Sequence, residues 1–296
     1  MYVMTIPYMD LDQIYESYGM LNWHKVSSGK YIIVHKDKVV KVEQRRENFV
    51  FSCSEEDFNN IWYKYFDVNT DYLKLHYMFR NVDEDEEFKI YCNRGKGVRI
   101  LRLEIFETIL LAIAIHYLKD EKQAHMLVHK ILPNVCCKKR KNSMGDAGAF
   151  VWREVPKPED IIKHKDKILK LDVSKGFVHD IIELSQNVVD GWLDLDMLYI
   201  MEMDAAIDYL KDYDWCKKDD IIRFICLYGL HDLMTFAYNK EIDSKIKKDF
   251  GMSYYKWLDY YLAGETKYIN NLGYMCQVIK YNIANPITKT NYDKNL

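Results

Sequence analysis

The first fifty or so residues alternate between short apolar runs and polar turns. Apolar and β-branched positions fall in residues 19–26, 30–35, 39–42 and 49–51, and turn signals such as Ser27-Ser28-Gly29 and Lys36-Asp37-Lys38 separate them. Short runs joined by tight turns are typical of antiparallel strands. We therefore predict a small antiparallel sheet at the start of the chain.

A helical period follows the last of these strands. Ser54 precedes three acidic residues, and an i, i+3, i+4, i+7 apolar face follows, made of Phe58, Ile61, Trp62 and Tyr65. Ser54 is expected to be the N-cap, and acids in the first turn suit the positive end of the helix dipole. The pattern predicts a helix over residues 54–65.

From about residue 70 the helical period continues to the end of the chain. The most apolar stretch, 101–118, predicts a central buried helix, and Pro158 with the acids after it predicts a helix start. Residues 142–148 form the clearest loop. Further helices are predicted at about 177–190, 195–212, 219–228, 239–250, 253–262 and 265–284. The predicted fold class is α+β, with an antiparallel α+β domain over 1–95 and a helical domain over 96–296.

The chain is almost neutral, with 42 basic and 45 acidic residues. This weighs against a protein covered in phosphate contacts, because duplex affinity comes largely from Lys and Arg. One basic face is still compatible with acidic faces elsewhere. The candidates are the run that contains Lys138, Lys139 and Arg140, and a lysine series within 157–170. A solvated loop and a solvated helix face account equally well for these charges.

The seven cysteines are scattered and form no CxxC pair. We therefore expect no zinc site, no iron–sulfur cluster and no other cofactor. His125 and His129 lie one helical turn apart, but no third ligand is in view, so we expect no metal there. Residues 1–10 lack the pattern of a signal peptide, and the apolar stretch 109–115 is too short to span a membrane. A cytoplasmic protein with reduced thiols and no membrane partner is expected.

Four segments, in this order, resemble 8-oxoguanine DNA glycosylases of the helix-hairpin-helix superfamily. They are residues 54–72, with the run Tyr65-Phe66-Asp67-Val68-Asn69-Thr70-Asp71-Tyr72, and residues 97–108, 156–177 and 224–239. The resemblance implies a sheet domain followed by a helical body with a hairpin at 210–230, and duplex DNA as the partner. It also implies base removal by a lysine amine that attacks the sugar, assisted by an aspartate.

The family's catalytic positions carry other residues in this chain. The lysine position falls on Asp220 and the aspartate position falls on Asn239. A carboxylate cannot form a Schiff base, and a neutral amide does not stabilise a cationic transition state as an anion does. The hairpin glycines fall on Cys216 and Lys218, where Lys217 and Lys218 can hold a phosphate as point charges. The resemblance thus implies loss of the standard glycosylase and lyase reaction.

Positions that contact the bases in this family are also replaced. The tract that fills the gap left by an extruded base falls around Tyr117 and has no asparagine, and the pair that engages the estranged base falls on Phe177 and Val178. The glycine that reads the oxidised base falls on Tyr18, next to Gly19. In this register the phenol ring of Tyr18 fills part of the base pocket.

Three functions remain open at this point. The first is a glycosylase-fold protein that binds DNA, a modified base or a protein partner without cutting. The second is a monofunctional glycosylase in which Asp220 or Glu241 activates water. The third is an interaction or inhibitor module, for which the 24 tyrosines would supply contact area. The plainest alternative is that both carboxylates are solvated charges at helix starts.

Overall fold

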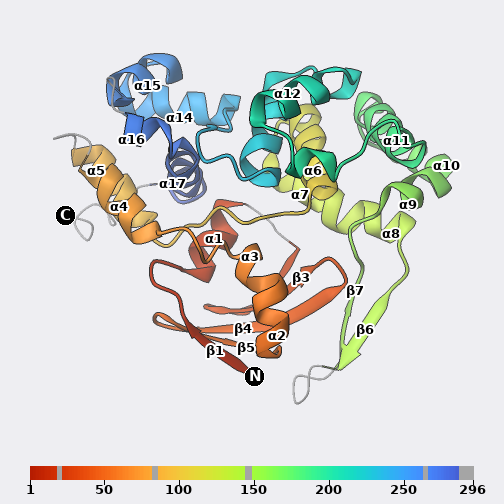
Figure 1. The fold of residues 1–296 in the computed structure, drawn as a ribbon, viewed down its shortest axis with the longest axis horizontal. Helices are drawn as coiled ribbons and strands as arrows, with labels where there is room; N and C mark the ends of the chain where they lie inside the picture. Colours follow the sequence, from red (N-terminus) through yellow and green to blue (C-terminus); the bar gives the residue numbers. More distant parts are fainter. Residues whose placement is uncertain (19–21, 82–85, 144–148, 263–265, 287–296) are drawn as a thin grey trace.

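The structure is a computed structural model that describes residues 1–18, 22–81, 86–143, 149–262 and 266–286. A five-stranded sheet lies at one end of the molecule and a helical body lies at the other (Figure 1). The N-terminal elements are β1 (Tyr2–Thr5), α1 (Leu11–Ser17), β2 (Trp23–Ser27), β3 (Lys30–His35), β4 (Lys38–Arg45), β5 (Asn48–Phe51), and a continuous helical stretch of α2 (Glu55–Asp57), η1 (Phe58–Trp62) and α3 (Tyr63–Tyr65).

The predicted antiparallel sheet is confirmed, with the strand order β1-β5-β4-β3-β2. Its buried face packs on the helix after β5, where the rings of Phe51 and Phe58 lie 4.7 Å apart. The predicted cap of that helix is also confirmed, because the Ser54 hydroxyl accepts a hydrogen bond from the Asp57 amide at 3.0 Å. The pattern did not predict β1 or α1. Helix α1 is capped by Asp10 and buries only a few apolar side chains.

The helical body contains most of the predicted helices. Its elements are α4 (Tyr72–Arg80), α5 (Glu86–Arg94), α6 (Ile105–Leu118), α7 (Glu121–Met126), η2 (Leu127–Ile131), α8 (Leu132–Cys136), β6 (Arg140–Ser143), β7 (Ala149–Trp152), α9 (Pro158–Lys163), α10 (Lys165–Ile168), α11 (Lys175–Val189), η4 (Met197–Tyr199), α12 (Met203–Lys211), η5 (Asp214–Cys216), α13 (Asp219–Phe224), η6 (Ile225–Gly229), α14 (Lys240–Phe250), α15 (Tyr254–Leu262), α16 (Thr266–Ile269) and α17 (Leu272–Ala284). The α+β class is therefore confirmed, and none of the helices among the described residues has the length and apolar character needed to cross a membrane.

Helix α6 is the predicted central buried helix, but it begins at Ile105 and not at residue 101. The four residues before it are extended because the N-terminal part supplies their hydrogen bonds. The amides of residues 100, 101 and 102 donate to the hydroxyls of Tyr72 and Tyr18 and to the carbonyl of Tyr65, at 2.9, 2.9 and 3.0 Å. A tertiary contact therefore overrides the helical pattern in this segment.

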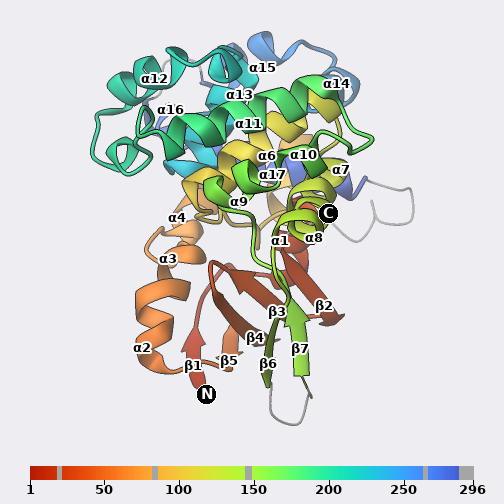
Figure 2. The same ribbon diagram turned by 90° about the vertical axis from the view of Figure 1, so that its right-hand side faces the viewer.

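The hairpin of β6 and β7 was not predicted. It leaves the helical body between α8 and α9 and extends along the sheet (Figure 2). The ring of Phe150 on β7 lies 5.7 Å from the ring of His24 on β2. The predicted loop at 142–148 lies mostly outside the described residues.

Helices α4 and α5 pack on the C-terminal helices. Phe79 lies 5.8 Å from Tyr274 of α17, and Phe88 lies 5.9 Å from Trp257 of α15, measured between ring centroids. The two helices therefore contribute to the helical body, although the sequence assigned them to the first ninety-five residues. The boundary near residue 95 remains a prediction.

The buried carboxylate of Asp67 ties the N-terminal part to the helical body. Arg102 places two nitrogens 3.0 and 3.1 Å from Oδ1, and the Tyr72 hydroxyl donates to Oδ2 at 2.9 Å. His231, which follows η6, lies 3.1 Å from Oδ2. Burial alone would raise the pKa of Asp67, but the surrounding donors and positive charges outweigh burial and lower that pKa to about 2. Asp67 is therefore ionised and held by partners from three segments.

We predict that Asp67→Asn lowers the free energy of unfolding by about 2 kcal/mol at neutral pH. The folded pKa lies below the unfolded value, so the stabilisation is present above about pH 4 and is lost as the pH falls toward 2. Urea unfolding at several pH values measures this, with Asp37→Asn in an exposed turn as the control. A loss that is the same at pH 3 and pH 7 would contradict the prediction.

Candidate functional site

Two adjoining cavities open between α1, α7, α13, α14 and α17. The larger has a volume of about 680 Å³ and the smaller about 290 Å³. Five residues line both cavities: Lys119, Glu121, Asn239, Lys240 and Glu241. We call the two cavities together the cleft. Its volume falls in the range of roughly 300–1,000 Å³ typical of ligand sites.

Asp220 lies in the first turn of α13 and lines the smaller cavity. Nδ1 of His116, at the end of α6, lies 2.8 and 3.0 Å from the two carboxylate oxygens of Asp220. Nζ of Lys119 lies 3.8 Å from Oδ2. The side chain of Asp220 is about one-third exposed. The acid is therefore engaged by two basic groups and is not a solvated charge at a helix start.

Asn239 is the N-cap of α14. Its side-chain oxygen accepts a hydrogen bond from the Ile242 amide at 2.8 Å. An asparagine suits this capping position as well as an aspartate does. Since Asn239 lines both cavities, the fold brings Asp220 and Asn239 into one cleft, as the resemblance implied.

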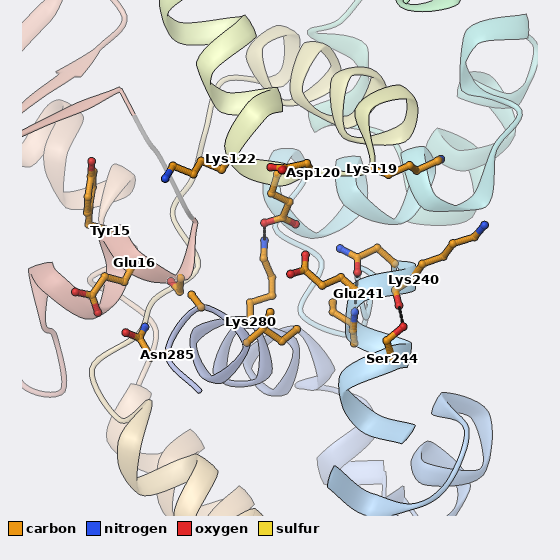
Figure 3. A pocket seen from close by; sticks show the side chains of 16 residues that line it. Tyr15, Glu16, Lys119, Asp120, Lys122, Lys240, Glu241, Ser244, Lys280 and Asn285 are labelled. Atoms are coloured by element: carbon orange, nitrogen blue, oxygen red, sulfur yellow. Dashed lines mark hydrogen bonds and ion pairs between the residues drawn. The ribbon is translucent and has the colours of Figure 1, made fainter. Parts of the chain in front are cut away.

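Glu241 follows Asn239 in the first turn of α14 and faces the larger cavity together with Lys280 (Figure 3). Burial and the negative charge of Glu121 raise the pKa of Glu241, while Lys280 acts in the opposite direction. A carboxyl group with a raised pKa is suited to exchange protons nearer neutral pH. Of the predicted site residues, Glu241 therefore has the clearest chemical potential.

Lys280 on α17 is a cleft residue that the sequence reasoning missed. Its side chain is almost fully buried, and Nζ lies 2.9 Å from the Glu121 carboxylate and donates to the Tyr228 hydroxyl at 3.1 Å. Nζ also lies over the rings of Tyr18, Phe224 and Tyr228, at 5.2, 5.7 and 4.8 Å from their centroids. Lys280 is the one charged residue in the sequence of α17, and this was the signal that could have indicated a buried, paired lysine. Buried lysines of this kind need a partner, and here the partner is Glu121.

The lysine network continues toward the N-terminal part. The Tyr228 hydroxyl donates to Oε1 of Gln277 at 2.8 Å, and Nε2 of Gln277 donates to the Ser17 hydroxyl at 2.7 Å. Tyr18, the next residue after α1, is fully buried and accepts the Leu101 amide. The inner wall of the cleft is therefore a fixed hydrogen-bonded surface that joins α17, η6 and α1.

The other predicted base-contacting residues lie outside the cleft lining. Phe177 is fully buried in the first turn of α11. Tyr117 lies on α6, and its hydroxyl donates to Asp180 of α11 at 2.8 Å. The ring of Tyr117 also covers Gly176 of α11. Neither residue lines the two cavities, and Tyr18 lies behind their wall. Their assignment to a base pocket remains a prediction. Gly19, the neighbour in that register, lies outside the described residues.

The predicted phosphate-binding residues are divided among three places. Lys218 precedes α13 and lines the smaller cavity, whereas the exposed Lys217 forms an ion pair with Asp214. Lys138 and Lys139 are exposed between α8 and β6. Arg140 pairs with Glu154 at 2.6 Å and lines a separate cavity of about 430 Å³.

The rim of the cleft carries lysines that the sequence reasoning did not select. Lys119, Lys122 and Lys240 are exposed around the larger cavity (Figure 3). In the part of the chain that the structure describes, neither Lys122 nor Lys240 has an ion-pair partner within 4 Å. The rim therefore offers positive charge to an anionic ligand.

One group of described residues has ligand atoms close enough for a metal ion. These are His179, Asp180 and Glu183 on α11, whose nearest ligand atoms lie within 4.8 Å of one another. His179 is three-quarters exposed, and Asp180 already accepts the hydrogen bond from Tyr117. This group contacts α6 and does not line the cleft.

The predicted histidine pair has a structural role. His125 and His129 are both buried, and Nε2 of His129 lies 2.8 Å from the Glu107 carboxylate of α6. Burial and the neighbouring His129 and Lys280 charges hold the pKa of His125 well below its usual value. The pair therefore helps to pack η2 and α7 on α6.

Comparison with known proteins identifies the N-terminal domain and the overall fold. Residues 4–109 match the family model of the 8-oxoguanine DNA glycosylase N-terminal domain. The structure of MBOgg1 in complex with a low-affinity DNA ligand is similar, with a TM-score of 0.80 and 20% identity over 95% of this chain and 94% of that one. Residues 4–109 therefore match the N-terminal domain of 8-oxoguanine DNA glycosylases, and the whole chain has the fold of these proteins.

Other solved structures of this glycosylase fold are similar as well. The Clostridium acetobutylicum 8-oxoguanine glycosylase/lyase, in complex with double-stranded DNA, has a TM-score of 0.76 and 20% identity over 97% of this chain and 93% of that one. The 3-methyladenine DNA glycosylase of Archaeoglobus fulgidus has a TM-score of 0.70 and 14% identity, with 96% and 98% covered. A comparison with curated proteins finds no significant match. At this identity the glycosylase likeness defines the fold of the whole chain.

Proposed function

We propose that this chain is a glycosylase-fold protein that binds DNA at the cleft and has lost the amine-dependent excision and lyase reaction. The observation that carries the proposal is the 2.8 Å contact between His116 and Asp220, with a carboxylate at the position that the resemblance gives to the nucleophile. A carboxylate cannot condense with a sugar aldehyde to form a Schiff base. The residue needed for the family reaction is thus replaced by a group of opposite charge.

Two nearby amines do not replace the missing nucleophile in this proposal. Lys119 lies 3.8 Å from Asp220, and Lys280 lies 2.9 Å from Glu121. Each amine is therefore already engaged by a carboxylate and is not directed at the position of a sugar in the smaller cavity. Lys280 is also buried beneath three aromatic rings, which stabilise its positive charge.

DNA binding is supported by the charge and size of the cleft. Exposed Lys119, Lys122 and Lys240 are placed to contact phosphates, and the larger cavity has room for an extruded base or nucleoside. Two of the similar solved structures are complexes with DNA. By contrast, residues 190–214, which lead into the hairpin, carry eight acids and one lysine. In this proposal the sugar–phosphate backbone of the DNA runs along Lys119, Lys122 and Lys240 at the rim of the cleft and avoids the acidic segment.

A second candidate is monofunctional base excision by a carboxylate. It is favoured by the raised pKa of Glu241, caused by burial and by Glu121. In this scheme Glu241 or Asp220 activates a water molecule that attacks the sugar, and no covalent intermediate forms. The two candidates differ in whether a base leaves the DNA.

We expect no covalent adduct when the protein is mixed with abasic-site duplex DNA and reduced with borohydride, because the position that the resemblance gives to the nucleophile carries the carboxylate of Asp220. The Clostridium acetobutylicum glycosylase/lyase is the positive control, and mass spectrometry of the protein is the readout. Monofunctional excision is tested in parallel with duplexes that contain an oxidised or alkylated base. After incubation with the protein, heating in alkali cleaves the DNA strand wherever a base has been removed. Excision that is lost in Glu241→Gln or Asp220→Asn would establish the second candidate and refute the first.

We also expect salt-dependent duplex binding that requires the rim. Replacing Lys122 and Lys240 with serine removes two phosphate contacts, so the slope of log K against log salt should decrease in magnitude by about 2. Fluorescence anisotropy at several salt concentrations measures the slope. Lys74→Ser with Lys248→Ser is the matched control, since both lysines are exposed and line neither cavity. Equal slopes for the two double variants would contradict the proposed DNA path.

A further inference from the structure

A second surface lies on the helical body, away from the cleft, at the α11–α12 connection and the outer side of α12. Large apolar side chains are exposed there in a short stretch of chain. Trp192 is 72% exposed and Ile200 is 76% exposed. Val189, Met197 and Tyr199 are exposed as well. We call this region, residues 189–214, the Trp192 surface. Helix α12 lies on the side of the body that is remote from the sheet (Figures 1 and 2).

The exposed tryptophan is held in place by the backbone around it. The Trp192 amide donates to the Asn187 carbonyl at 2.9 Å, and its own carbonyl accepts the Tyr213 hydroxyl at 2.6 Å. The next residue, Leu193, is buried, and the Asp194 amide donates to the Tyr209 hydroxyl at 3.0 Å. These hydrogen bonds fix the backbone on both sides of Trp192, where the side chain is 72% exposed. Its exposure is therefore a built feature of the fold.

The apolar side chains are interleaved with negative charge. Residues 190–214 contain eight acids, all exposed: Asp190, Asp194, Asp196, Glu202, Asp204, Asp208, Asp212 and Asp214. The region has one basic residue, Lys211, which lies 4.0 Å from Asp208. Asp204 and Asp208 lie four residues apart on one face of α12, and Asp212, four residues further on, is its C-cap. The formal charge of the region is −7.

Charge decides which class of partner fits this surface. The negative charge of this surface would repel nucleic acid and anionic lipid. Two copies of the chain would also repel each other at this surface, because both would present the same negative charge. Apolar anchors surrounded by acids match a segment with apolar side chains and Lys or Arg around them. The surface already holds one cation in this way, because Nζ of Lys64 lies 5.6 Å from the centre of the Tyr199 ring.

We propose that the Trp192 surface binds a basic, apolar-bearing segment of a partner protein. Trp192 and Ile200 supply the buried contact, and the acids of α12 supply steering and register. The docking is independent of DNA binding at the cleft, because none of the residues of the Trp192 surface lines the two cavities.

The test uses a fluorescent peptide of about 16 residues with leucines at helical spacing and lysines elsewhere. Anisotropy should show binding that weakens as salt rises. Binding should become at least about tenfold weaker in Trp192→Ser with Ile200→Ser, and separately in Asp204→Lys with Asp208→Lys. Leu169→Ser, at another side chain that is 62% exposed, is the matched control and should bind like the wild type. Circular dichroism confirms that each variant is folded.

Several outcomes would overturn the proposal. One is no binding of the lysine–leucine peptide, and another is equal binding by the folded Trp192→Ser/Ile200→Ser variant and the wild type. A third is binding of a lysine–serine peptide as tight as that of the lysine–leucine peptide, because the surface would then recognise positive charge alone and not apolar side chains. Concentration-dependent dimers in sedimentation, lost in the Trp192 variant, would assign the surface to a second copy of the chain.

Discussion

The buried carboxylate of Asp67 determines how the two ends of this molecule fit together. It gathers Arg102 from the segment before α6, Tyr72 from α4 and His231 from the turn after η6. Because an ionised group in the interior must be paired, these three segments are fixed relative to one another. The extended residues before α6 are thereby held in place, and α6 runs from there toward His116, which contacts the cleft residue Asp220. The geometry of the cleft thus depends on a contact at the opposite end of α6.

Within that frame, Asp220 and Asn239 both line the smaller cavity. Each has a structural partner of its own: His116 for Asp220, and the first turn of α14 for Asn239. Lys280, fixed by Glu121 in the opposite wall, carries the buried positive charge. The substitutions are therefore accommodated by the local hydrogen bonding, and the cavity itself is retained.

The sequence predicted what local chemistry determines and missed what distant contacts determine. Ser54 as a cap, the start of α9 at Pro158 and the antiparallel strands follow from neighbours in the chain. The late start of α6, the β6–β7 hairpin and the burial of Lys280 depend on partners many residues away. Asp220 and Asn239, which the resemblance selected, both line the smaller cavity, but no local pattern could indicate that His116 would contact the acid.

The central claim is that the wild-type protein forms no Schiff base because position 220 carries a carboxylate and not an amine. The most direct measurement is reductive trapping of Asp220→Lys combined with Asn239→Asp on abasic-site duplex DNA, followed by mapping of the modified residue. The account predicts a covalent adduct at residue 220 in this variant, with none in the wild type. An adduct on any lysine of the wild-type protein, or no adduct in a folded variant that binds the duplex, would contradict it.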